Sequence, residues 1–479
     1  MRNAIVSILV TFLLTCPVPV IAQGADAGKI ETTYYVSSSK GNDSYDGLTA
    51  KTPKQHIYAI GKKENVHILL KSGDVFFEQI LSYSNCIIES YGRGDKPVLC
   101  GFKVLMNPQA WTYDEQEGLW KIDLLKEDNF AGMMHGDVAD DRINNIGFIY
   151  DPHADKVYGK RVREVGQIKE DGTFYLTDQF KPDSVKSDTF RYLRWKSGKD
   201  PRSINHLCFP MWLIAVRYLN NCELRNIAIV GFNFGVVNCN GTVVDNCQID
   251  LIGGSVQLGY QYWVRYGNGI EYTRANKDNV VKNCLISRTY DCGTSIQSSG
   301  NFNGSPKNIH FVENRFYHCR QAFEFFLNAK NDYKPQYNEC SFSNNICYLM
   351  GENEFSTPQL RDANLLSYDG TAKSITIEGN TFFGAPYFCG AVFPNGLQKN
   401  TVYVFEGQYL YNYHGQRTLP VVIANGNNEI EQYRKQSGDD SEIIIMQKSS
   451  WFAKRTERKI KKKVGWKPVN LKLERLKNN

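Results

Sequence analysis

Short runs of alternating apolar and polar residues recur through the middle of the chain, from about residue 220 to residue 395. Alternation with a period of two is typical of a β-strand that buries one face, and no apolar stripe of helical period accompanies it. Each of six such runs carries an Asn within or beside the alternating residues. The runs are LRNIAIVGF from 224, VVDNCQIDL from 243, VVKNCLISR from 280, IHFVENRFY from 309, CSFSNNICY from 340 and ITIEGNTFF from 375.

The six asparagines predict a solenoid with one coil per repeat. Their successive spacings are 20, 37, 31, 31 and 35 residues, and such periods are typical of solenoids. Asn tolerates the left-handed turn conformation, and amides stacked about 4.8 Å apart can hydrogen-bond along the stack. We therefore predict an all-β fold, a right-handed parallel β-helix, rather than a β-propeller with antiparallel blades. The asparagines are Asn226, Asn246, Asn283, Asn314, Asn345 and Asn380.

The rest of the chain divides around these coils. Arg2 and the apolar run from Ile5 to Leu14 predict a secretory signal, and this run is too short to span a membrane. A lipoprotein signal at Cys16 is the alternative. We expect a secreted or periplasmic protein, or one attached to the cell surface. The expected segments are a signal peptide (1–22), an N-terminal cap with the first coils (23–104), an inserted antiparallel β-rich subdomain (105–210), further coils with a C-terminal cap (211–446) and a basic tail (447–479).

Thirteen cysteines would suit a disulfide framework in an oxidising compartment, but their placement predicts mostly free thiols. Cys222, Cys247, Cys284 and Cys340 each follow Asn or Glu inside a strand-like run. That position suits a small apolar side chain stacked in a core. No CxxC or CxxxxH spacing indicates a zinc site.

Positive charge is concentrated at the C-terminus. The net charge is +6, but residues 448–479 carry twelve Lys or Arg against two Glu, so the rest of the chain is mildly acidic. This distribution does not fit a uniformly basic nucleic-acid-binding protein. We expect the segment to be either an amphipathic helix that caps the solenoid or a loose tail. Its charge either is solvated or faces an acidic glycan or a membrane surface.

Three stretches near the N-terminus combine short strands with polar turns. They are YYVSSSKGNDSYDGLTAKTP from 34, VHILLKSGDVFFEQI from 66 and IIESYGRGDKPVLCG from 87. They resemble the opening of secreted bacterial β-helix proteins of the pectate-lyase-like superfamily. The resemblance implies the β-helix fold and a polysaccharide lyase or glycoside hydrolase, without selecting one reaction.

The first of these stretches begins like a strand and continues as a polar, turn-rich loop. We expect residues 34–36 to open the first coil and residues 37–53 to cover an otherwise open sheet edge. Asn42, Asp43 and Asp46 form either a calcium site or Asx turns in a solvated loop.

The strands that follow the Asn turns place carboxylates on one face. Aligned after each turn, Glu271, Ser295, Glu324 and Ser367 form one outward column. Glu271 and Glu324 are then two coils apart, or about 9.6 Å between their Cα atoms. Because the side chains can lean closer than the Cα atoms, this range overlaps the separation of roughly 6.5 to 9.5 Å between acid and base in inverting glycosidases. We predict that these two glutamates are catalytic.

Asp291 and Arg320 stand on neighbouring coils at the corner before this column. They are a second pair of catalytic-site candidates. They either clamp a substrate, because Arg forks onto carboxylates, or form a structural salt bridge.

Substrate-binding candidates surround the same face. Gln297, Arg288 and Asp369 flank it, and Tyr272 belongs to a dense group of aromatic residues on which sugar rings can stack. In the inserted subdomain, His135 stands close to three Asp residues and an Arg. That group shuttles protons through His135, binds calcium through its three Asp residues, or is a polar surface loop.

Three functions fit these patterns. A glycoside hydrolase needs two carboxylates astride the scissile bond, and the two glutamates favour it. The resemblance also allows a lyase acting on a uronic-acid glycan, in which calcium often neutralises the carboxylate and Lys or Arg is often the base. Arg320, Arg288 and Lys330 would then be the candidates. The third possibility is a non-catalytic β-helix that binds glycan. In each case the expected partner is a polysaccharide, and the chain is expected to be a monomer.

Overall fold

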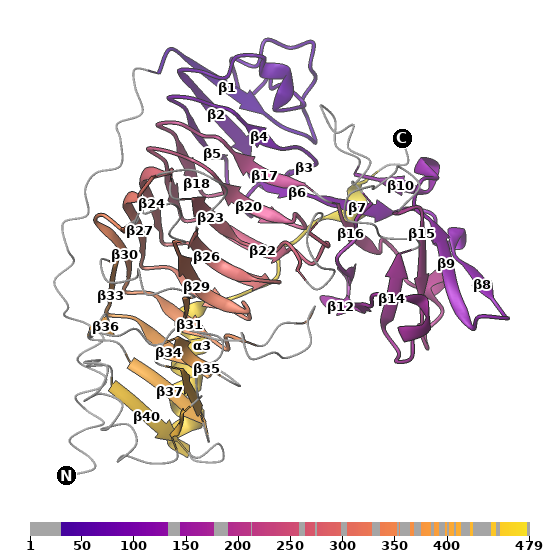
Figure 1. Ribbon diagram of the computed structural model, residues 1–479. Coiled ribbons are helices and arrows are strands. Elements are labelled where there is room, and N and C mark those ends of the chain that lie inside the picture. The colour runs from indigo at the N-terminus through magenta and orange to yellow at the C-terminus, as the bar shows by residue number, and fades with distance from the viewer. Residues whose placement is uncertain are drawn as a thin grey trace.

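The described part of the computed structural model is built mainly from three long parallel sheets that run the length of a solenoid (Figure 1). The chain visits the three sheets in turn, so that each of the central coils contributes one strand to each sheet. This is the predicted right-handed parallel β-helix with an inserted antiparallel subdomain, and the fold class is confirmed. The described residues are 30–132, 144–176, 190–211, 213–257, 264–273, 275–297, 304–327, 336–351, 354, 365–367, 375–384, 388–391, 398–399, 402–406, 409–412, 422–424, 442–446 and 451–476.

The strands of the three sheets follow one another along the solenoid axis. The first sheet contains β1 (Thr32–Val36), β2 (Val66–Lys71), β5 (Ile87–Tyr91), β18 (Glu223–Arg225), β21 (Val243–Asp245), β24 (Lys277–Lys282), β27 (Lys307–Val312), β30 (Cys340–Ser343), β33 (Ile375–Glu378) and β36 (Gln398–Lys399). The second sheet contains β3 (Val75–Phe76), β6 (Val98–Cys100), β19 (Ala228–Val230), β22 (Gln248–Ile252), β25 (Leu285–Thr289), β28 (Arg315–Tyr317), β31 (Ile346–Tyr348), β34 (Thr381–Phe383), β37 (Val402–Glu406) and β40 (Glu442–Met446). The third sheet contains β4 (Ile80–Leu81), β17 (Ile214–Arg217), β20 (Phe234–Val237), β23 (Ile270–Thr273), β26 (Cys292–Gln297), β29 (Gln321–Phe326) and β32 (Leu365–Ser367).

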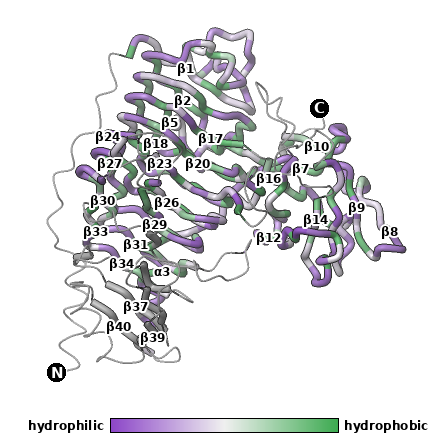
Figure 2. The backbone as a smooth tube through the Cα atoms, viewed as in Figure 1, coloured by the Kyte–Doolittle hydropathy of each residue, from purple (hydrophilic) through white to green (hydrophobic). Residues whose placement is uncertain are grey.

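Stacked apolar side chains fill the interior of the solenoid. Ile249, Ile286 and Phe316 are paired in register on successive coils and are fully buried. Apolar and polar residues alternate along the coils, as Figure 2 shows. The eleven cysteines with described side chains are free and buried, mostly in this core. The predicted free thiols are confirmed for these residues.

The asparagines occupy two adjacent columns rather than the single column that we predicted. Asn283 pairs with Glu313, because Lys282 pairs with Val312, and Asn314 therefore continues the neighbouring Cys284 column. The first column takes the left-handed turn conformation, and the second points into the core. The left-handed residues are Asn226, Asn246, Asn283, Glu313, Asn344 and Gly379.

The inward column forms a hydrogen-bonded amide ladder along the axis. Asn314 Oδ1 accepts from the backbone N–H of Cys284 (3.0 Å), and Asn345 Oδ1 accepts from that of Asn314 (2.9 Å). Asn380 Oδ1 in turn accepts from the backbone N–H of Asn345 (2.9 Å). All three asparagines are fully buried. Because every step satisfies a buried donor, the ladder fixes the register of these coils.

The loop after β1 covers the open edge of the first sheet, as predicted. The backbone N–H of Tyr35 donates to the carbonyl of Gly47 (2.7 Å), and the carbonyl of Tyr35 accepts from the backbone N–H of Lys54 (2.9 Å). Ser37 donates in turn to the carbonyl of Lys54 (2.8 Å). These bonds occupy edge groups of β1 that would otherwise be open to another strand.

The inserted subdomain leaves the solenoid through β7 (Phe102–Leu105) and returns through β16 (Cys208–Pro210), which pair antiparallel. It has its own aromatic core around Trp111 and Trp195. Its other strands are β8 (Thr112–Asp114), β9 (Leu119–Asp123), β10 (Phe130–Ala131), β11 (Ile149–Asp151), β12 (Lys156–Tyr158), β13 (Lys160–Arg161), β14 (Thr173–Leu176) and β15 (Tyr192–Trp195). A further sheet contains β35 (Phe388–Ala391), β38 (Tyr409–Asn412) and β39 (Val422–Ala424).

The basic C-terminal segment is ordered in the described residues and lies along the side of the solenoid. Its helix α3 (Trp451–Val464) packs on the second sheet, so the expectation that it caps the end was wrong. No helix among the described residues is long and apolar enough to cross a bilayer. The short 3-10 turns are η1 (Tyr58–Ile60), η2 (Pro108–Ala110), η3 (Glu127–Asn129), η4 (Val165–Gln167), η6 (Pro201–Ser203) and η8 (Leu473–Arg475).

We predict that Asn345→Ala destabilises the solenoid by on the order of 3 kcal/mol. The change leaves the buried N–H of Asn314 and the carbonyl of Phe311 without the side chain that now satisfies them. The matched control is Asn344→Gly, because glycine accepts the left-handed conformation at no steric cost. Urea unfolding of both variants measures the difference. Equal effects of the two changes would contradict the ladder's role.

Candidate functional site

The outer face of the third sheet carries the predicted carboxylate column. Glu271 pairs with Ser295 and Ser295 with Glu324 on successive coils, so their predicted alignment is confirmed. The extension to Ser367 is wrong, because Glu324 pairs with Leu366. A slip of one residue turns a side chain to the other face of a strand.

Glu271 is held by two side-chain amides. Asn268 Nδ2 donates to its Oε2 at 2.6 Å, and Gln297 Nε2 donates to the same oxygen at 3.1 Å. Burial raises the pKa of Glu271 to about 7, against the lowering effect of the Asn268 hydrogen bond. The charge of Asp291 raises this pKa further, whereas that of Arg217 lowers it. A carboxyl group with such a pKa can carry a transferable proton near neutrality.

A short polar chain connects Glu271 to Glu324. Asn268, which binds Glu271, also accepts from the thiol of Cys292 through its Oδ1 (3.1 Å). The same thiol lies 3.8 Å from Glu324 Oε2. Burial raises the pKa of Cys292 well above its usual range, which keeps it a neutral thiol. The contacts from Glu271 through Asn268 and Cys292 to Glu324 therefore link the two glutamates across the coil that lies between them.

Asn268 and Cys292 were not among the predicted site residues. Each stands three residues before the column position of its own coil, Asn268 before Glu271 and Cys292 before Ser295. The polar residue Gln321 holds the same place before Glu324, and all three are buried. This repeated offset was the signal that could have identified them.

Asp291 and Arg320 lie on adjacent coils at this corner, as expected. The backbone N–H of Gln321 donates to the carbonyl of Asp291 at 3.2 Å. Arg320 as a whole is 4% exposed, and its guanidinium lies over the ring of Tyr290, 5.6 Å from the centroid. The pair therefore borders the Glu271 site. Its role as a clamp stays a prediction.

Arg217 joins the site from the opposite direction along the axis. It pairs with Val237, which in turn pairs with Glu271, so it lies two coils from that glutamate in the same column. Its guanidinium lies over the ring of Tyr218, at 4.3 Å, and Tyr218 is 46% exposed. The repeat that we recognised in the sequence began after this residue, so no pattern pointed to it.

Tyr272 does not belong to the outer face. Its ring is fully buried in the main core and stacks on Phe311, with 5.9 Å between centroids. The expectation that it binds substrate was wrong, because neighbours along a strand point to opposite faces. Gln297, by contrast, reaches Glu271 directly.

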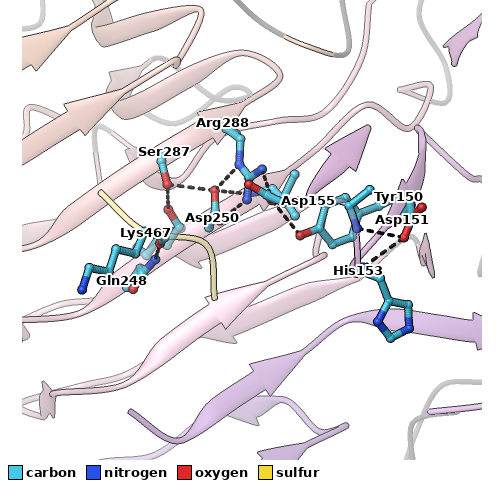
Figure 3. A network of polar contacts seen from close by, with 12 residues as sticks. Tyr150, Asp151, His153, Asp155, Gln248, Asp250, Ser287, Arg288 and Lys467 are labelled. Atoms are coloured by element: carbon cyan, nitrogen blue, oxygen red, sulfur yellow. Dashed lines mark hydrogen bonds and ion pairs between the residues drawn. The ribbon is translucent and has the colours of Figure 1, made fainter. Parts of the chain in front are cut away.

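Arg288 was expected beside the site but belongs to the second sheet, in β25. It is 1% exposed and forms ion pairs with Asp250 (2.5 Å) and with Asp155 of the inserted subdomain (2.7 Å). Figure 3 shows this network between the solenoid and β11–β12. The guanidinium also lies 4.9 Å from the ring centroid of Trp466. The expectation of a substrate contact is therefore corrected to a structural role that joins three parts of the chain.

The remaining predicted residues fall into two groups. Asp369, His135 and Lys330 lie outside the described residues, as does the predicted signal peptide. The three candidate calcium ligands are in the described loop after β1, where hydrogen bonds of the chain already engage them.

In that loop, Asn42 Oδ1 accepts from the backbone N–H of Ser44 (2.9 Å) and Asp46 Oδ1 from that of Leu48 (3.0 Å). Asp43 Oδ2 lies 2.6 Å from His56 Nδ1. Within the described ranges, no three His, Cys, Asp or Glu side chains gather as a metal site. These contacts support the Asx-turn alternative for the loop.

Comparisons with known proteins give similarities of low sequence identity. No protein-family model and no curated protein sequence matches the chain. Among solved structures, a complex of XylC with xylose has a TM-score of 0.45 and 9% identity, with 86% of this chain and 83% of that chain covered. A GH136 lacto-N-biosidase from Eubacterium ramulus has a TM-score of 0.39 and 14% identity, with 87% and 68% covered. An exopolygalacturonase from Thermotoga maritima has a TM-score of 0.32 and 12% identity, with 76% and 83% covered. Similarity at this level carries no information on activity.

We predict that Arg288→Ala lowers the free energy of unfolding by about 3–5 kcal/mol, because it leaves the fully buried Asp250 carboxylate without its counter-charge. The double variant Arg288→Met with Asp250→Leu should recover most of the loss, since it removes both charges and keeps apolar volume. Thermal and urea unfolding measure both effects.

The matched control for this prediction is Arg202→Ala. Arg202 forms a surface ion pair with Asp200 in which both side chains are 43% exposed, so its loss should change stability by less than about 1 kcal/mol. A stable Arg288→Ala protein that has lost only polysaccharide binding would contradict the structural role.

Proposed function

We propose that this protein is a polysaccharide-acting glycoside hydrolase in which Glu271 is the general acid and Glu324 the general base. The observation that carries the proposal is the pKa of about 7 at Glu271, on the same outward column as Glu324. Glycoside hydrolysis uses one carboxyl group that donates a proton and a second that accepts one, and we assign these roles to Glu271 and Glu324.

The hydrogen bonds of Glu271 define which of its oxygens carries the proton. Asn268 and Gln297 both donate to Oε2, so the proton of the neutral acid resides on Oε1. In the proposed step Oε1–H protonates the glycosidic oxygen as the bond to the anomeric carbon breaks. Glu324 takes a proton from a water molecule, whose oxygen forms the new bond to that carbon. Glu271 is left as a carboxylate and regains a proton from solvent, and Glu324 releases to solvent the proton that it took from the water.

The spacing of the two residues supports inversion of configuration. They lie two coils apart, which separates their Cα atoms by about 9.6 Å, so side chains that lean toward each other would bring the carboxyl groups within the roughly 6.5 to 9.5 Å at which inverting enzymes admit the water. The column runs along the solenoid axis, so an extended glycan chain would lie across successive coils. Arg217 lies in this column two coils from Glu271 and can bind an anionic group of the glycan.

We predict that the purified protein releases reducing ends from at least one member of a panel of neutral and acidic polysaccharides. Glu271→Gln and Glu324→Gln should each lower the rate by about 10²–10⁴-fold, because each removes a proton-transfer group. Glu313→Gln is the matched control, since it removes one carboxylate from an exposed corner of the solenoid. NMR of the first product should show inverted anomeric configuration.

Other outcomes of this experiment identify the alternatives. Ultraviolet absorbance from an unsaturated uronic product, with activity kept in the Glu→Gln variants, would establish elimination. Binding without turnover, unchanged in both variants, would establish a non-catalytic glycan-binding protein. First-formed product of retained configuration would make Glu324 a nucleophile instead of a base.

The neighbouring charges give a second prediction, on pH dependence. If Glu271 is the acid, kcat/KM falls as the pH rises through its pKa of about 7. Asp291→Asn removes a charge that raises this pKa, so the alkaline limb of the profile should move to lower pH. Arg217→Met removes a charge that lowers it, so the limb should move to higher pH. Shifts in the same direction, or no shift in either variant, would exclude Glu271 as the acid.

A further inference from the structure

Helix α3 is fixed to the outer face of the second sheet by its apolar side. Ile460 and Val464 are buried against Leu285 and Tyr348 of that sheet. Tyr348 Oη donates to Glu457 Oε1 (2.7 Å), which turns the helix's acidic side chain toward the solenoid. In Figure 1 the helix lies beside β31 and β34.

The chain beyond α3 holds the helix in place from its C-terminal end. It runs back along the second sheet toward the inserted subdomain (Figure 1). Gln248 Nε2 donates to the carbonyl of Lys467 (2.8 Å), and the ring of Trp466 packs on Tyr317, with 4.6 Å between centroids. Further along, Lys472 Nζ lies 3.3 Å from Asp95 Oδ2. The helix is therefore a rigid platform rather than a solvated tail.

The solvent face of this platform is densely cationic. The buried residues Ile460 and Val464 define one side of the helix, and the exposed Lys and Arg residues occupy the arc opposite to them. A helix of fourteen residues is about 21 Å long, so the cations form a broad positively charged face along it, on a chain whose remainder is mildly acidic. The exposed cations are Lys454, Arg455, Arg458, Lys459, Lys461, Lys462 and Lys463 in the helix, and Lys467 just beyond its end.

We propose that the exposed face of α3 is a second binding surface, separate from the third-sheet site, for an anionic polysaccharide. A linear polyanion can lie along this cationic face, and the packed helix beneath it limits the entropy lost on binding. Trp451 adds a ring that is 71% exposed at the start of the helix, with the Arg455 guanidinium 5.1 Å from its centroid. This surface would retain the protein on an acidic glycan whether or not that glycan is cleaved.

The packing of α3 favours a polysaccharide over a membrane. An interfacial helix binds a bilayer by burying its apolar face among the lipids. In α3 that face already packs on the second sheet through Ile460 and Val464. Among the described side chains of α3, the cationic residues and Trp451 are left for a partner, and a soluble polyanion needs no apolar insertion.

The test compares polysaccharide binding by the mature protein and a charge-reversal variant. The variant carries Arg458→Glu, Lys459→Glu and Lys462→Glu, all in the middle of the exposed arc. Both proteins also carry Glu271→Gln and Glu324→Gln, so that turnover does not consume the probe. We expect salt-dependent binding of polygalacturonate or alginate, no binding of neutral dextran, and at least tenfold weaker polyanion binding by the variant.

A control variant with Lys51→Glu, Lys199→Glu and Lys307→Glu changes the net charge equally at exposed sites elsewhere. It should keep its affinity, and the thermal midpoints of all variants should agree. Equal losses in both triple variants, or none in the helix variant, would overturn the proposal. Binding to phosphatidylserine vesicles without binding to either polyanion would overturn it in favour of a membrane. Activity is measured separately without the Glu→Gln changes, so failure of the hydrolase proposal leaves this result readable.

Discussion

Backbone hydrogen bonding between successive coils is the interaction on which the rest of the structure depends. It repeats at about 4.8 Å and places every strand residue directly beside its counterpart in the next coil. Glu271, Ser295 and Glu324 are far apart in sequence but become neighbours through this pairing alone. The inward asparagine ladder strengthens the same pairing by satisfying one buried donor at each step. The geometry of the site is thus a consequence of the register.

Much of the architecture could be predicted because the strands repeat one physical pattern. Alternation and period identified the coils, and the edge loop after β1 followed from the need to occupy open strand groups. The prediction of a single asparagine column was only partly right, because other residues, including Glu313 and Gly379, also take the left-handed turn conformation. Sequence spacing alone could not distinguish the column of left-handed turn residues from the inward asparagine ladder, which lies one residue further along each coil. Ser367 was misaligned for a similar reason, because the long connection before β32 gives no sequence signal that fixes its register to within one residue.

The candidate site could be predicted where it depends on strand parity and not where it depends on distant contacts. Once Glu271 faces outward, parity requires that Tyr272 face inward, so that error was avoidable. The position of Arg288 was not open to such reasoning. Its partners Asp155 and Asp250 come from the inserted subdomain and from the preceding coil. Only the folded chain brings them together around one guanidinium.

The properties that suit Glu271 to proton transfer also weaken the fold. Its pKa of about 7 in the folded protein lies above the ordinary value of 4.5, so the folded state binds a proton that the unfolded state releases. The resulting loss of stability is absent below about pH 4.5, grows between these two values, and reaches roughly 3 kcal/mol above pH 7. A neutral carboxyl group at physiological pH therefore requires a scaffold with stability to spare. Stacked coils that share one register supply it, because the apolar core continues on both sides of Glu271 and the amide ladder extends from the next coil onward.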